Sequence, residues 1–244
     1  MRLGLGQGLG AGQSSGGLSI VRDGLVMEHK YNTSSIQPLS DGAAYFDGSA
    51  DSYIFVEDNS SLDFESAFTS ACWIMPDAAS ADWKYLYGKG NLSSGNQGVK
   101  LLAIDTNGLY RFEINELSAS RVESTTVLPN DEWAHIACTY DKSNTKIYIN
   151  GVLEDTQNFT SKINTNNERL HIGMGKSTSN GWNGYMSNLA MWNVALTQEQ
   201  IKSIMFKQYA ELSTSESANL VSWWAFGTDA NDATGTNNGT ISGG

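Results

Sequence analysis

The most informative stretch of this chain is residues 133–153, which read WAHIACTYDKSNTKIYINGVL. Strand-forming residues, β-branched or aromatic, flank Asn150-Gly151 on both sides. Asn-Gly suits the positive φ angles of a two-residue type I′ turn, so the dipeptide predicts a tight antiparallel hairpin. Residues 133–140, 146–149 and 152–153 are therefore expected to be strands.

Short runs of the same kind continue along the chain, separated by turns rich in Gly, Asn, Asp and Ser. The further runs are residues 44–46, 53–56, 68–75, 83–87, 99–104, 109–114, 170–174 and 185–192. In one of them Tyr110, Phe112 and Ile114 share one face. Arg111 and Glu113, which lie between them, share the other. This spacing of strands and turns predicts an all-β sandwich of two antiparallel sheets.

One short helix is expected to interrupt the strands. Thr197 and Gln200 have the spacing of a capping box, which marks a helix start. The residues that share the apolar face of the expected helix are Ile201, Ile204, Met205, Tyr209 and Leu212. Residues 213–215, Ser-Thr-Ser, are expected to end it. We expect this helix to pack on the rim of the sandwich, in a structural role.

Composition and charge exclude several classes of protein. The chain has 244 residues, of which 40% are hydrophobic and 10% aromatic, too many for a disordered chain. Its formal net charge of −11 repels phosphate backbones and anionic membrane surfaces. No apolar run approaches the length that spans a bilayer. We therefore expect neither nucleic-acid binding nor membrane insertion.

Residues 1–17 differ from the rest because glycines alternate there with Leu3, Leu5 and Leu9. The segment does not resemble a secretion signal, since no apolar core follows its single positive charge. It is interpreted either as a flexible leader or as an arm that docks on a partner through the three leucines.

Three groups of motifs, in this order, resemble the laminin-G-like, concanavalin A-like lectin family. The motifs are AYFDGSADSYI (44–54) with FTSACWI (68–74), WAHIACTYD (133–141) with IYING (147–151), and LHIG (170–173) with WNGYM (182–186) and ALT (195–197). NLVSWWAF (219–226) is similar to a segment that commonly opens a domain of this family, although here it comes near the end of the sequence. The resemblance implies a jelly-roll sandwich over residues 18–244, with a terminal strand near 219–226.

Because the family includes glucanases, we looked for a pair of catalytic carboxylates. Retaining glycosidases need two carboxyl groups about 5 Å apart. Glu113 and Glu116 are the nearest candidates, but their spacing of three residues predicts that they point to opposite faces of a strand. The sequence therefore predicts a protein that is not an enzyme.

Two kinds of binding site remain open. Many relatives of this family bind calcium, and Asp47, Asp51 and Asp58 offer oxygens near one turn, although Asp is also common in turns because it caps them.

A carbohydrate site needs exposed aromatic rings beside Asn or Asp. The candidate residues for such a site are Asp82, Trp83, Tyr85, Asn180 and Trp182. Either tryptophan could instead belong to the core.

The two cysteines, Cys72 and Cys138, each lie within an expected strand. Cysteines in such positions are usually small buried hydrophobes, so we expect free thiols, with a cross-strand disulfide as the alternative.

Two functions fit these observations. The first is a structural, decoration or adhesion protein of a virion, of the kind found in bacteriophages, located in the particle as a homo-oligomer with the arm docked on other virion proteins. Host surface glycans are a further expected partner in that setting. The second is a glycan-binding module of a bacterial cell-surface or extracellular protein. Neither function requires a cofactor, and calcium is the one candidate for a bound ion.

Overall fold

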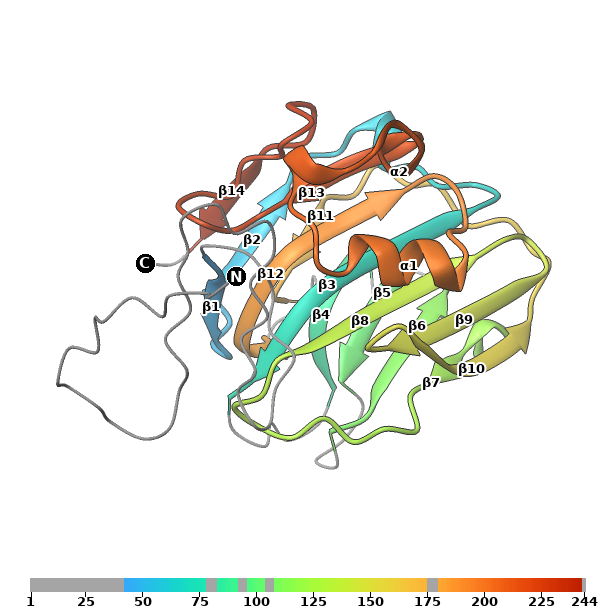
Figure 1. Ribbon diagram of the computed structural model, residues 1–244, viewed down its shortest axis with the longest axis horizontal. Coiled ribbons are helices and arrows are strands. Elements are labelled where there is room, and N and C mark those ends of the chain that lie inside the picture. Colours follow the sequence, from blue (N-terminus) through green and yellow to red (C-terminus); the bar gives the residue numbers. More distant parts are fainter. Residues whose placement is uncertain (1–41, 78–82, 92–95, 104–107, 175–179, 243–244) are drawn as a thin grey trace, which may run out of the picture. The chain divides into compact units, whose positions relative to one another are not determined.

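A computed structural model describes residues 42–77, 83–91, 96–103, 108–174 and 180–242 (Figure 1). Every described residue belongs to one compact unit, Ser34–Gly244. These residues form two antiparallel sheets, A and B, which share one core. The all-β sandwich predicted from the sequence is therefore confirmed.

Sheet A has the order β1–β12–β3–β8–β9–β10, and β13 also pairs with β12. Its strands are β1 (Ala44–Asp47), β3 (Phe68–Pro76), β8 (Ala134–Tyr140), β9 (Asn144–Ile149), β10 (Val152–Asn158), β12 (Asn183–Trp192) and β13 (Leu220–Trp224). Between β9 and β10, Asn150 and Gly151 both have positive φ angles, 50° and 73°. The hairpin predicted from Asn-Gly is therefore confirmed.

Sheet B has the order β14–β2–β11–β4–β5–β6–β7. Its strands are β2 (Tyr53–Val56), β4 (Lys84–Asn91), β5 (Asn96–Ala103), β6 (Tyr110–Ile114), β7 (Val122–Glu123), β11 (Leu170–Ile172) and β14 (Gly239–Ser242). The sequence analysis did not predict β7 or β14. Neither strand has a long alternating pattern in the sequence. Strand β7 is defined by its pairing with β6, and β14 by its pairing with β2.

The core fills the space between the sheets with the inward-facing side chains of both. Phe112 and Ile136 are completely buried in it. Cys72 and Cys138 also lie there, and both are free thiols, as expected. Burial raises the pKa of each thiol, so neither is reactive near neutral pH.

Helix α1 (Gln198–Ile204) begins at the predicted capping box, in which Thr197 and Gln200 bond reciprocally. The prediction that it packs on the rim is wrong: Ile201 and Ile204 pack on the outer face of sheet A against Trp192. Figure 1 shows α1 crossing in front of β3 and β8.

The predicted end of the helix is also wrong. The Met205 carbonyl, which a longer helix would pair with a later amide, accepts a hydrogen bond from Trp73 Nε1 at 2.8 Å instead. Ser213 caps a second helix rather than ending the first. The remaining helical elements are η1 (Ser60–Leu62), η2 (Ser118–Ser120), η3 (Tyr209–Glu211) and α2 (Thr214–Ser217).

Strand β10 forms one edge of sheet A, and its pairing with β9 is interrupted by a bulge between Leu153 and Asp155. The bulged residue, Glu154, accepts hydrogen bonds from the backbone amides of Thr125 and Thr126, both at 2.9 Å. Burial by itself would raise the pKa of Glu154, but hydrogen bonds from the hydroxyls and the amides of Thr125 and Thr126 together lower it. The bulge therefore ties the edge of sheet A to the loop after β7.

Candidate functional site

Charged side chains gather on the outer face of sheet B, over β5 and β6. Lys100 on β5 is the register partner of Glu113 on β6. Phe112, the residue between Arg111 and Glu113, is buried in the core. Because side chains alternate along a strand, Arg111, Glu113 and Lys100 all lie on the outer face. This agrees with the alternation seen in the sequence.

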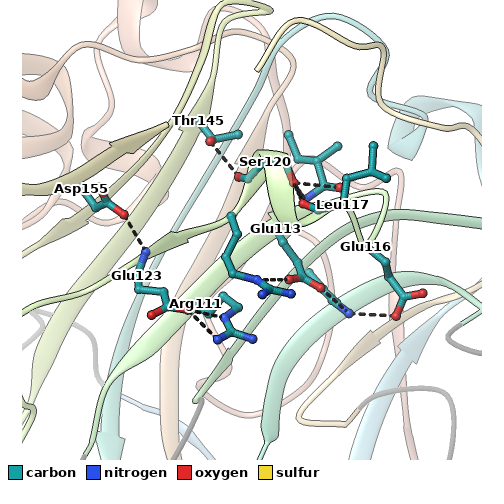
Figure 2. Close-up of polar contacts among 11 residues, drawn as sticks. Arg111, Glu113, Glu116, Leu117, Ser120, Glu123, Thr145 and Asp155 are labelled. Atoms are coloured by element: carbon teal, nitrogen blue, oxygen red, sulfur yellow. Dashed lines mark hydrogen bonds and ion pairs between the residues drawn. The ribbon is translucent and has the colours of Figure 1, made fainter. Parts of the chain in front are cut away.

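Lys100, Glu113 and Arg121 form a partly buried ion network (Figure 2). Lys100 Nζ lies 2.7 Å from Glu113 Oε1, and Arg121 Nε donates to Glu113 Oε2 at 3.0 Å. Burial by itself would raise the pKa of Glu113, but the hydrogen bonds and charges of Lys100 and Arg121 outweigh it and hold this pKa below its usual value. Burial by itself would lower the pKa of Lys100, but the hydrogen bond and the charge of Glu113 raise this pKa above its usual value. Both groups are therefore ionised near neutral pH.

Glu116 joins the same network, which corrects the prediction that Glu113 and Glu116 point to opposite faces. Lys100 Nζ lies 3.0 Å from Glu116 Oε1 as well. The strand ends at Ile114, and the next two residues, Asn115 and Glu116, both have φ angles of 56°. The strand rule does not apply beyond Ile114, because this left-handed turn brings the Glu116 side chain back over Lys100.

Ser120 holds that turn in place (Figure 2). Its hydroxyl accepts from the Ile114 amide at 2.9 Å and donates to the Leu117 carbonyl at 2.7 Å. Its own carbonyl accepts a hydrogen bond from Thr145 Oγ1 on β9 at 2.8 Å. The position of Glu116 thus depends on bonds that reach across to sheet A.

Trp83 lies at the margin of the charged cluster. The Arg111 guanidinium is 4.6 Å from the centre of its ring, and Arg111 Nε also donates to Glu123 Oε1 at 2.7 Å. Trp83 remains 42% exposed. Its φ angle of 58° lies in a region that bulky residues rarely adopt, and such strain is concentrated at functional sites.

Tyr85 and Asn180 adjoin Trp83. The Tyr85 amide donates to the Asn180 carbonyl at 3.0 Å, and the Tyr85 ring lies 5.9 Å from Lys100 Nζ. Three of the residues predicted to bind sugar are therefore brought together, and they adjoin the ion network. We call the surface formed by Trp83, Tyr85, Arg111, Glu116 and Glu123 the Trp83 face.

Of the other two predicted residues, Trp182 does not belong to this surface. Trp182 is only 1% exposed and packs in the core, with its ring 6.2 Å from that of Tyr110. The prediction of an exposed Trp182 is therefore wrong, because the side chain is needed to fill the sandwich. Asp82 lies outside the described residues.

The sequence analysis did not identify Lys100, Arg111, Arg121 and Glu123 as residues of the site. The only available signal was the outward face of β6, where Arg111 and Glu113 alternate with buried residues. Their partners come from β5, from the residue after η2 and from β7, and a sequence pattern does not show which strands become neighbours.

The ion network beside the Trp83 face does not supply a glycosidase acid. A glycosidase acid must hold its proton near neutral pH, and this requires a raised pKa. Glu113 has a lowered pKa and two cationic partners, so it is ionised and engaged. The face can instead offer one exposed ring with charged hydrogen-bonding groups beside it.

The three aspartates predicted for calcium do not fit a calcium site. Asp47 Oδ1 accepts from the Ser49 amide at 2.8 Å, which is the turn-capping role. Asp58 lies beyond the far end of β2 from Asp51 and pairs with Lys89 at 2.7 Å. Across the described ranges, no group of three or more His, Cys, Asp or Glu side chains is placed to hold a metal ion.

Leu3, Leu5 and Leu9 lie outside the described residues, as does the whole of the predicted arm. Within the part of the chain that the structure describes, no helix has the length and apolar character needed to cross a membrane.

The chain was compared with known families and proteins. A sequence model of the concanavalin A-like lectin/glucanases superfamily, of laminin G type, matches residues 47–202. No curated protein sequence matches the chain.

Several solved structures have a similar fold. A candidate carbohydrate binding protein from Bacteroides ovatus is 22% identical with a TM-score of 0.63, and the match covers 85% of this chain and 60% of that one. Domain 4 of AbnA, an extracellular GH43 arabinanase from Geobacillus stearothermophilus, was solved with arabinotriose; it is 19% identical with a TM-score of 0.52 over 67% of this chain and 76% of that one. The binding domain of Paraclostridial Mosquitocidal Protein 1 is 19% identical with a TM-score of 0.55, over 67% of this chain and 42% of that one. The chain thus spans about three fifths of the Bacteroides protein.

Proposed function

Because the chain belongs to the concanavalin A-like lectin/glucanases superfamily, we propose that it is a non-enzymatic carbohydrate-binding module of a bacterial cell-surface or secreted protein. The observation that carries the proposal is the Trp83 face. There an exposed indole, contacted by Arg111, stands beside Glu116 and Glu123, which are ion-paired with Lys100 and Arg111.

Each part of this face has a role in sugar binding. The exposed ring of Trp83 gives an apolar surface for the C–H face of a sugar. Glu116 and Glu123 are partly exposed and accept hydrogen bonds from hydroxyl groups. Lys100 and Arg111 fix these acceptors, so little side-chain entropy is lost on binding.

Two of the similar structures support this proposal. The Bacteroides protein is a candidate carbohydrate binder, and the arabinanase domain was solved with arabinotriose. Arabinose-containing polymers are therefore sensible first ligands to test.

Assembly into a virion, the other function expected from the sequence, depends on residues 1–17. These lie outside the described residues, and no similar structure reported above concerns a virus. Sugar binding is therefore the function that the observations support best.

The test is affinity gel electrophoresis of the whole chain in gels that contain arabinan, xylan, glucomannan or mixed-linkage β-glucan. We expect at least one polymer to retard the protein, and Trp83→Ala to weaken that binding by about tenfold or more, as for a central aromatic anchor. Tyr209→Ala is the matched control, because Tyr209 is 39% exposed and lies on η3. Equal retardation of Trp83→Ala and the wild type would exclude the Trp83 face as the site.

A further inference from the structure

A row of four side chains crosses sheet A at the end away from α1. Tyr45, Tyr185 and Met75 are register partners on β1, β12 and β3. Trp133 immediately precedes β8, at the position that continues this register. Tyr45 is 48% exposed, and the other three are partly exposed. We call these four residues the aromatic row.

The aromatic row lies outside the part of sheet A that the helix covers. Helix α1 packs on Ala71 and Ala137, farther along β3 and β8 (Figure 1). Between the two regions lies Trp73, which is buried and bonded to the end of the helix. The outer face of sheet A therefore has an apolar cover at one end and an accessible apolar surface at the other.

The rings of the row are close enough to act as one surface. The ring centres of Tyr45 and Tyr185 are 4.8 Å apart, and those of Tyr185 and Trp133 are 6.4 Å apart. Neighbouring strands are about 4.8 Å apart, so the row extends about 14 Å across four strands. A surface of this length contacts several sugar rings of an extended oligosaccharide.

Charge selects the kind of ligand. Tyr45 Oη donates to Asp77 Oδ2 at 2.9 Å, which places a carboxylate at the edge of the row. Asp47 is the next outward residue along β1. The carboxylates of Asp77 and Asp47 repel anions and accept hydrogen bonds from hydroxyl groups. An uncharged oligosaccharide fits, whereas a phosphorylated or sulfated one does not.

We propose that the aromatic row, with Asp77 at its edge, is a second carbohydrate-binding surface, specific for an uncharged oligosaccharide. This inference rests on the proposed function in one respect, since both assume a carbohydrate ligand. The two surfaces lie on opposite sheets, so one copy of the chain holds two sugar chains at once.

Isothermal titration calorimetry separates the two surfaces. The probes are arabinotriose, xylotetraose, cellotetraose and mannotetraose, each titrated into the whole chain and into its variants. We expect Trp83→Ala to keep one site per chain. Adding Tyr45→Ala and Trp133→Ala to that variant should weaken the remaining binding by about tenfold or more.

Two further variants test the role of the row. Tyr45→Phe keeps the ring and should restore most of the affinity lost in Tyr45→Ala. Asp77→Asn keeps the shape but removes the charge, and it should admit anionic oligosaccharides that the wild type rejects. Thermal unfolding of each variant shows whether it is folded, and Tyr209→Ala is again the control.

The pattern of losses decides between the two proposals. If Tyr45→Ala with Trp133→Ala abolishes binding while Trp83→Ala does not, the row is a site and the Trp83 face is not. If Trp83→Ala alone removes all binding, or if no probe binds, the row is not a sugar site. If Tyr45→Ala instead turns a sedimenting dimer into a monomer without changing sugar binding, the row is a self-association surface and the inference is overturned.

Discussion

On the outer face of sheet A, α1 covers β3, β8 and β12 with apolar side chains, whereas on the outer face of sheet B charged side chains cover β5 and β6. The first cover is stabilised by the hydrophobic effect, which has no direction and leaves nothing for a ligand to bond. In the charged cover over β5 and β6, each buried charge is paired with an opposite one, and carboxylates with a fixed orientation remain at its margin. The comparison shows two ways of covering a sheet, of which only the charged one leaves fixed hydrogen-bonding groups beside the cover.

The largest expected effect is on the apolar cover. Trp192 is completely buried, packs against Trp223, and donates to the Glu216 carbonyl at 2.8 Å. Trp192→Ala should lower the free energy of unfolding by about 4 kcal/mol, because it leaves a cavity and an unpaired carbonyl. Urea denaturation at pH 7 measures this, with Val127→Ala at an exposed position as the control. A loss no larger than that of the control would show that the helix adds little stability.

The charged cover should be less costly to disrupt. Among the described residues, Glu113→Ala leaves Lys100 paired with Glu116 alone, and we expect a loss of about 3 kcal/mol. The exposed pair of Glu57 and Arg169 provides the control, and Glu57→Ala should cost less than about 1 kcal/mol. Similar losses in the two variants, measured by the same denaturation, would mean that burial does not strengthen the network.

A smaller effect distinguishes the two faces by pH. His135 lies under the apolar cover, and burial lowers its pKa from 6.5 to about 3. The folded state therefore disfavours protonation, so stability is complete above pH 6.5 and falls as the unfolded chain binds a proton below it. Between pH 7.5 and 5.0 the expected loss is about 2 kcal/mol. The lowered pKa of Glu113 also contributes to stability, but this contribution is lost only when the pH falls below 4.5, the ordinary pKa of a glutamate.

The matched variant is His135→Phe, which keeps a ring against Trp73. The variant should lack the loss of stability that His135 causes over this pH range. Any change that remains should come from groups that the wild type also contains. Parallel curves for the two proteins would contradict the assignment of the loss to His135.

Much of the fold could be predicted because local signals agree with it. Asn150-Gly151 specifies its turn through positive φ angles, and Thr197 with Gln200 specifies a helix start. The end of α1 could not be predicted, because it depends on a hydrogen bond from Trp73, more than a hundred residues away in sequence. Strand β14 likewise depends on its pairing with β2.

The site was harder to predict than the fold. Trp83 and Tyr85 have aromatic character that the sequence displays directly, and they lie together on the surface. Trp182 has the same character but fills the core, and only the packing of the two sheets distinguishes these cases. Glu116 shows a second limit, because a left-handed turn after β6 reverses the direction that strand alternation assigns to it.

The bulge in β10 has a consequence for how copies of this chain behave toward one another. As an edge strand with Val152 and Leu153 exposed, β10 offers backbone groups and apolar side chains that could pair with a strand of another molecule. The bulge at Glu154 interrupts the regular ladder, and its carboxylate, with that of Asp155, puts negative charge on the edge. The contact that anchors the loop after β7 thus also protects the sandwich against aggregation through this edge.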